Sequence, residues 1–340
     1  MIENIEPLRN ALGTIQSLYN FLEASPKRHA IFRDTDVESD HLKLSLKSQS
    51  IMRWSWSCRH EAVKAVVEQL ERIIKSLLKL STDKDSKTYS DARGLLAVIA
   101  DFDFIFGLCL LKVILTNTSS LSRFLQGKNI SVGTARRNAN LTMETLSTCQ
   151  NDHHFDSLWD LAVHVSEKVN KWIENTRFSF REAAAPRVKK PSHHLQAVVG
   201  ECSAQPLMPT TKSHYRVNVF YTALDKVLAE LRSRFSGNDQ DVLCGLGDLV
   251  MKADPSVDSF DLVSSYYNLD KDLLIAEHEL FNSYKSSHDL DCSGNATDIL
   301  SVLREHELTE FVPEFTQVVK LLCAIPATSC SAERSFSALR

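Results

Sequence analysis

Residues 61–80 read EAVKAVVEQLERIIKSLLKL, and their apolar side chains recur three and four positions apart. In an α-helix this spacing places the apolar side chains on one face and leaves the charged residues between them in solvent. The apolar positions are Val63, Val67, Leu70, Ile74 and Leu77. The segment therefore predicts an amphipathic helix that buries one face.

The same spacing recurs along the rest of the chain. It covers residues 8–22, 158–173, 219–231, 274–284 and 315–322. Alternating runs bounded by Asn-Gly or Asp-Gly, which would indicate hairpins, are lacking, and the 340 residues include only 10 glycines. The sequence predicts an all-α protein.

The run from Gly94 to Asn117 approaches the length of a membrane span. Asp101, Asp103 and Lys112 lie inside it, and each charge at bilayer depth costs about 2.5–3.5 kcal/mol. We therefore expect a buried helix in a large helical core and no membrane partner.

The charge of the chain is unevenly distributed. Its net charge is −4, but residues 251–310 hold 13 acidic and 4 basic side chains, a net of −9, so the remainder carries +5. This balance does not indicate a mainly basic nucleic-acid binder. The start of the chain shows no secretory signal, so the eight cysteines are expected to be reduced inside the cell. The chain has no Gly-rich phosphate loop, GxSxG or HExxH motif, so no small-molecule substrate is expected.

Residues 183–214 interrupt the helical pattern. They contain four of the nine prolines, and Arg187, Lys189, Lys190 and the pair His193 and His194 lie among them. This composition is typical of a flexible linker. A second interpretation is that the basic side chains contact DNA. We expect it to divide a helical part over residues 1–182 from another that begins at residue 215.

Two short segments carry potential metal ligands. The stretch from Asp289 resembles a calcium loop but has Leu300 where a bidentate glutamate is required, so we expect a turn in which Thr297 or Asp298 caps the next helix. Cys149, His153 and His154 lack a clear fourth ligand, so they are expected to mark a polar helix end.

Residues 321–340 read LLCAIPATSCSAERSFSALR. We expect a helix from about Pro313 to near Ala324, because Pro326 cannot continue it. The small polar residues that follow can cap a new helix, with Glu333 in or near its first turn. A carboxylate there either complements the helix dipole or serves as a ligand for Mg²⁺.

This ending resembles the C-terminal SERxFS signature of the hAT superfamily of DNA transposases. Ala332 is inserted before the acid, as in the zinc-finger MYM-type, transposon-derived members. The matching positions are Pro326, Ser331, Glu333, Arg334, Phe336 and Ser337. Earlier blocks are similar in the same order, among them RWSWSCRHEAV with Trp54, Trp56 and Arg59. Either tryptophan can correspond to the one that the family motif contains.

The resemblance implies a ribonuclease-H-like catalytic core interrupted by an all-helical insertion. The family's transposases use two Asp and one Glu to hold two metal ions, and Glu333 matches the Glu. The two Asp should precede residue 1, so we expect a chain made almost entirely of the insertion, with only the final catalytic helix of the core. Asp101 and Asp103 are poor substitutes, since residues two apart on a helix point to different sides.

The resemblance therefore implies a nuclear protein without catalysis of its own, with protein dimerisation and DNA contact as residual roles. No cofactor is expected, and Mg²⁺ is expected only if the missing catalytic part is present. The alternative is the C-terminal part of an active DDE-type transposase whose first portion lies outside this sequence. An unrelated helical scaffold is a third reading, which the order of the matching blocks argues against.

The family's C-terminal dimerisation region is expected to start within residues 309–340, after a second helical part over 215–308. Its apolar side chains should form an association surface that makes the chain a homo-oligomer. They are Phe311, Phe315, Val318, Leu322, Phe336 and Leu339.

Overall fold

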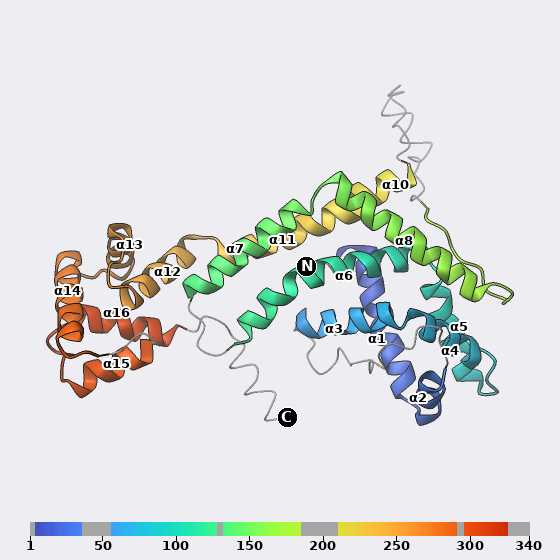
Figure 1. The fold of residues 1–340 in the computed structure, drawn as a ribbon, viewed down its shortest axis with the longest axis horizontal. Coiled ribbons are helices and arrows are strands. Elements are labelled where there is room, and N and C mark those ends of the chain that lie inside the picture. Colours follow the sequence, from blue (N-terminus) through green and yellow to red (C-terminus); the bar gives the residue numbers. More distant parts are fainter. Residues whose placement is uncertain (1–3, 36–55, 128–131, 185–209, 291–295, 326–340) are drawn as a thin grey trace, which may run out of the picture. The chain divides into compact units, whose positions relative to one another are not determined.

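A computed structural model describes residues 4–35, 56–127, 132–184, 210–290 and 296–325 (Figure 1). Every named element within these ranges is a helix, so the all-α prediction is confirmed. The chain forms two compact units, which are treated separately below. Unit 1 comprises Met1–Ser119 and Thr145–Leu228, and unit 2 comprises Ser120–Glu144 and Ala229–Arg340. Each unit thus draws on segments from both sides of residues 183–214.

Among the described residues, ten helices lie wholly or at least half in unit 1. They are α1 (Glu6–Glu23), α2 (Pro26–Arg33), α3 (Trp56–Glu68), α4 (Leu70–Leu80), α5 (Ser86–Ile99), α6 (Phe102–Leu125), α8 (Asp152–Ile173), α10 (Thr211–His214), η2 (Tyr215–Tyr221) and α11 (Thr222–Phe235). Unit 2 contains α7 (Val132–Thr148) in large part, α12 (Asn238–Met251), α13 (Val257–Tyr267), α14 (Lys271–Ser287), α15 (Ala296–Glu305) and α16 (Pro313–Ala324). The helices α6, α7 and α11 continue across the boundary between the units.

The segment 61–80 forms two helices instead of one. Gln69 has φ −112° and ψ 18° and separates α3 from α4. The apolar face is nevertheless buried as expected, with Leu70, Ile74 and Leu77 inside the core. Hydrophobic periodicity cannot detect this break, because the apolar spacing continues across it.

The apolar run from residue 94 to 117 is also divided, so the expectation of one helix is wrong. Arg181 donates its N–H to the Ala100 carbonyl oxygen and accepts from the Phe102 N–H, both at 2.9 Å. Asp101 lies between these contacts and accepts the Asp103 N–H at 2.9 Å, which ends α5 and begins α6. Among the described residues, α6 is the one helix long and apolar enough to cross a membrane, and 72% of its most apolar window is buried, as in a core helix.

Aromatic side chains of α6, α8 and η2 form the centre of unit 1. The ring of Phe106 lies 5.0 Å from that of Tyr215 and 6.3 Å from that of Phe155. Tyr215 is buried, and its hydroxyl donates to Asp103. Burial, followed by this hydrogen bond, raises the pKa of Tyr215. Residues 145–173 and 210–228 are therefore part of the same core as the N-terminal helices.

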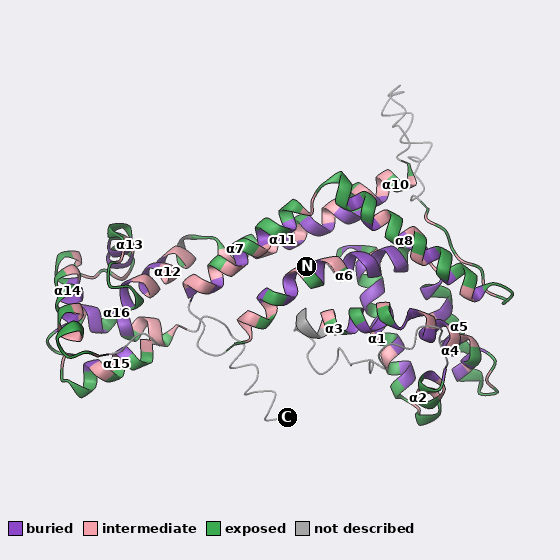
Figure 2. Ribbon diagram, viewed as in Figure 1, coloured by how far each residue is buried: buried purple, intermediate pink, exposed green. Residues whose placement is uncertain are grey.

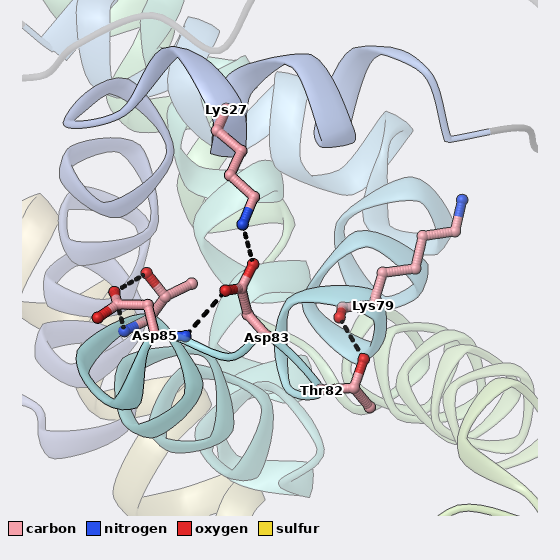
Figure 3. Close-up of polar contacts among 6 residues, drawn as sticks. Lys27, Lys79, Thr82, Asp83 and Asp85 are labelled. Carbon is pink, nitrogen blue, oxygen red and sulfur yellow. Dashed lines mark hydrogen bonds and ion pairs between the residues drawn. The ribbon is translucent and has the colours of Figure 1, made fainter.

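The turn between α4 and α5 is held by acidic side chains (Figure 3). Asp85 caps α5 by accepting the Thr88 N–H at 3.0 Å and the Thr88 hydroxyl at 2.6 Å. Asp83 accepts the Asp85 N–H at 3.0 Å and the Lys27 ammonium of α2 at 2.6 Å. These hydrogen bonds lower the pKa of both carboxyls. The turn thus ties α2 to the start of α5.

Two helical glycines are expected to respond to the same substitution in opposite directions. A Cβ at Gly107 of α6 would lie 2.8 Å from the Pro7 carbonyl oxygen of α1, whereas one at exposed Gly94 of α5 would have no atom within 4 Å. Gly107→Ala should lower the free energy of unfolding by about 1–3 kcal/mol, because the close neighbour is backbone. Gly94→Ala should raise it by about 0.5–1 kcal/mol through helix propensity. Denaturant unfolding measures both, and changes of the same sign would contradict this packing of α6 on α1.

Candidate dimerisation surface

Helices α12 to α16 enclose the core of unit 2. Buried side chains from all five helices contact one another in one cluster. Its largest members are Phe260, Phe281 and Phe315, and the Phe281 and Phe315 rings lie 4.9 Å apart. This core fixes which sides of α14 and α16 remain accessible.

Helix α14 is apolar on two sides. Its inner side is buried and consists of Leu274, Glu277, His278 and Phe281. Its outward face consists of Leu273, Ala276, Leu280, Tyr284 and Ser287. Leu273 and Leu280 are 45% and 47% exposed, and Figure 2 shows exposed turns along this helix beside buried ones. Exposed leucines repeated along one helix face are unusual unless another element covers them.

A hollow of about 240 Å³ adjoins the C-terminal half of the outward face. The small side chains of Ser283 and Ser287 line it on α14, and Phe311 lines it from the opposite side. Phe311 is 65% exposed. The other lining residues are Leu280, Phe281, Tyr284, His288, Leu308 and Val312. The hollow is therefore mainly apolar and has an accessible phenylalanine at its edge.

Polar contacts fix one edge of the hollow. His288 Nδ1 donates to the Tyr284 carbonyl oxygen at 3.0 Å, and its ring stacks on Tyr284 with centroids 4.0 Å apart. The Tyr284 hydroxyl lies 3.0 Å from His306 Nδ1, just beyond the end of α15. These bonds join α14 to the end of α15, so this wall of the hollow is preformed.

A buried carboxylate on α14 caps α16. Glu277 is 2% exposed and accepts the Phe315 N–H at 2.8 Å. The N-cap residue Val312 has no side-chain bond to offer, and Pro313 has no N–H. Burial raises the pKa of Glu277, the N–H groups of Phe315 and Glu314 oppose this, and the Glu314 charge adds to it. Glu277 thereby fixes the start of α16 against α14.

The neighbouring residue His278 is buried on the same helix. Its Nε2 donates to the Lys252 carbonyl oxygen at 3.2 Å, and its ring lies 5.6 Å from Phe260 and 5.7 Å from Phe315. Burial lowers the pKa of His278, although hydrogen bonding to the backbone of Lys252 and Leu249 and, after it, the charges of Glu279 and Asp254 act in the opposite direction. The folded unit therefore favours the neutral form of the His278 imidazole over the protonated form.

This burial predicts a loss of stability in mild acid. Unfolding exposes His278, whose ordinary pKa is 6.5, so the unfolded chain binds a proton that the folded chain resists. The free energy of unfolding should fall as the pH falls below about 6.5. His278→Gln keeps an N–H donor and does not titrate, so the difference between the two proteins isolates the effect. Denaturant unfolding of wild type and variant from pH 8 to 5, about 1.5 units on either side of that pKa, measures this difference. If the free energy of unfolding of the two proteins changes with pH in the same way, the prediction is wrong.

The residues that the sequence predicts for the association surface differ in how far they are exposed. Phe311 is exposed and lines the hollow, and Leu322 is half-buried. Phe315 and Val318 are 1% and 0% exposed, so the expectation that they form part of an open surface is wrong. They lie on the side of α16 that packs against α12, α14 and α15. The boundaries predicted for this helix, Pro313 and Ala324, are confirmed.

Most residues of the two family motifs, and the last of the expected association residues, cannot be compared with the structure. Trp54, Pro326, Ser331, Glu333, Arg334, Phe336, Ser337 and Leu339 lie outside the described residues. Trp56 is the first described residue of α3. Arg59 lies on the first turns of the same helix and is half-buried.

Residues 291–295 of the calcium-loop-like segment lie outside the described residues, so only the segment at Cys149, His153 and His154 can be compared with the structure. Within the described ranges, no three His, Cys, Asp or Glu side chains are grouped so that they could hold a metal ion. His153 and His154 are exposed at the start of α8, where Asn151 accepts the His154 N–H at 2.8 Å, as expected for a polar helix end. Helix α15 begins at Ala296, so Thr297 and Asp298 follow its first residue and do not cap it.

The outward face of α14 was missed in the sequence. The signal was present as adjacent pairs of apolar residues, Leu273 with Leu274 and Leu280 with Phe281. Adjacent residues on a helix point about 100° apart, so such pairs indicate that two sides are apolar. Only one of these sides can face the core of unit 2.

Comparison with known protein families gives a match in the C-terminal part of the chain. Residues 280–340 match the hAT family C-terminal dimerisation region. The match confirms the resemblance and begins at Leu280, earlier than the expected start at residue 309. It includes the end of α14, the hollow, α15 and α16.

Curated relatives are similar over a longer segment. The human 52 kDa repressor of the inhibitor of the protein kinase is 23% identical over 240 residues, which are 66% of this chain and 28% of that protein. The mouse protein of the same name is 23% identical over 241 residues, 66% of this chain and 29% of its own length. The match therefore spans less than a third of either relative. No solved structure matches the chain significantly.

Proposed function

We propose, from the hAT family C-terminal dimerisation region that this chain carries at residues 280–340, that the protein is transposon-derived and acts by self-association through unit 2. The strongest support is that the exposed apolar surface and the match to the dimerisation region occupy the same segment. The exposed Leu280 and Phe311 and the hollow between them lie within the segment that matches the dimerisation region. Apolar surface in such a segment is expected to be covered by a partner.

We further propose that the chain has no strand-transfer activity by itself. Two-metal phosphoryl transfer requires several carboxylates that converge on both ions. The described residues bring no such group together, and Glu333, the match to the family's third acid, lies outside them. Location in the nucleus, kinship with the zinc-finger MYM-type members and the ribonuclease-H-like origin of the helices belong to the same proposal.

DNA contact is the second part of this proposal, and the charge distribution limits where it can occur. Residues 251–310 carry a net charge of −9 and would repel phosphate. The basic residues of 183–214 are the better candidates, although most of that segment lies outside the described residues.

Co-expression of the chain with two different affinity tags tests the association. Purification through one tag should recover the other in similar amount, and light scattering should report twice the mass of the chain. Recovery of one tag alone from a folded preparation would refute the proposal. The alternative, an active transposase fragment, predicts that the chain nicks supercoiled DNA with Mn²⁺ and that Glu333→Gln abolishes the nicking, whereas we expect the two proteins to be equally inactive.

A further inference from the structure

The outward face of α14 has the spacing of a helix-pairing seam. Leu273, Leu280 and Ser287 are each seven residues apart, which is the repeat that keeps one stripe of a helix against another helix. Ala276 and Tyr284 fill the space between them on the same face. Leu280 lies midway between the other two members, so the stripe has an apolar centre and different ends.

We infer that two copies of the chain pair their α14 helices antiparallel, with a two-fold axis at Leu280. The inference rests on the proposed self-association and assigns its geometry. In this arrangement Leu280 contacts Leu280 of the second copy, and Leu273 faces Ser287 of the second copy. A two-fold contact of this kind closes on itself, as expected for a dimer.

The hollow supports the assignment of Leu273. Ser283 and Ser287 are small, and together with Phe311 they leave about 240 Å³ beside the C-terminal half of α14. Antiparallel pairing brings Leu273 of the second copy over this space, where it can fill the hollow against the Phe311 ring. The hollow and the exposed leucine are thus complementary parts of one surface, and each copy supplies both.

Charge along α14 favours the antiparallel direction. Asp270, Lys271 and Asp272 lie at the start of the helix, a net charge of −1, whereas Lys285 and His288 lie at its end and Asp289 follows them. Antiparallel pairing brings Asp272 of one copy near Lys285 and His288 of the other, and the helix dipoles also align favourably. Parallel pairing would instead place Asp272 of the two copies side by side, and like charges across an interface are unfavourable.

Helix pairing alone is too small to make a stable dimer. Specific interfaces bury about 1,200–2,000 Å² in total, which exceeds what a few turns of one helix provide. The exposed Phe311 and the neighbouring Leu308 extend the apolar surface beyond α14. A second copy that covers both the helix and this turn therefore accounts for the exposure of all these side chains.

Cysteine cross-linking of the full-length chain tests the geometry. Leu280→Cys should form a disulfide-linked dimer with itself under mild oxidation, because the axis brings the two side chains together. Leu273→Cys and Ser287→Cys should each remain mainly uncross-linked alone and should cross-link when mixed. The unmodified chain, treated in the same way, controls for the eight native cysteines.

The other outcomes are distinguishable. Self-cross-linking of Leu273→Cys and of Ser287→Cys would show parallel pairing and overturn the inference. A chain that is dimeric by light scattering but cross-links at none of these positions would place the seam elsewhere, while the proposed function would stand. A chain that is monomeric by light scattering would overturn both.

Discussion

Leu280→Glu is expected to raise the dissociation constant of the dimer by roughly 100-fold or more, which corresponds to a loss of about 3 kcal/mol. The two-fold axis places both copies of residue 280 at the centre of the interface, so one substitution introduces two facing carboxylates. Each loses hydration when the apolar surfaces meet, and they repel each other. A dilution series followed by light scattering measures the change.

Leu161→Glu is the matched control for this substitution. Leu161 is a leucine of the same exposure class, 45% against 47%, on a helix of unit 1. It should leave the dissociation constant unchanged. Neither variant should change the free energy of unfolding of the monomer by more than about 0.5 kcal/mol, because both positions are accessible to water. Equal weakening by the two substitutions would indicate a general effect of charge and would remove the support for α14.

Glu277→Ala is expected to lower the free energy of unfolding by about 2–3 kcal/mol. The carboxylate is the acceptor for the buried Phe315 N–H at the start of α16, and no side chain at the N-cap can replace it. Removal therefore leaves buried donors without a partner and opens a space between α14 and α16. Denaturant unfolding measures the loss.

Glu277→Gln separates the hydrogen bond from the charge. The amide oxygen can still accept the Phe315 N–H, and the repulsion from Glu314 disappears. We expect this variant to lose less than half of what Glu277→Ala loses. If the two variants are equally destabilised, the negative charge itself holds the start of α16, and the capping argument is wrong.

The sequence was sufficient for the helical class because the periodicity of the core-facing residues is strong. It identified the buried faces of the segments around residues 70 and 274 and both ends of α16. It did not show the breaks at Gln69 and at Ala100–Asp101. The second break depends on hydrogen bonds to Arg181, which is 80 residues away in the chain, so no local pattern could reveal it.

The association surface was only partly predictable for a related reason. Phe311 was identified correctly as an accessible apolar residue, but Phe315 was not, since both are simply phenylalanines near a helix start in the sequence. Their difference arises from contacts with α14, which carries Phe281 against Phe315 and leaves Phe311 uncovered. The family resemblance indicated that this region has a role in association. The residues that remain accessible could be identified only from the packing of unit 2.

Sedimentation equilibrium of the full-length chain tests the central claim most directly. The chain should pass from one to two chain masses as its concentration rises through the micromolar range, and Leu280→Glu should remain at one chain mass over the same range. A wild-type chain that stays monomeric throughout, or a Leu280→Glu chain that dimerises as the wild type does, would contradict self-association through the outward face of α14.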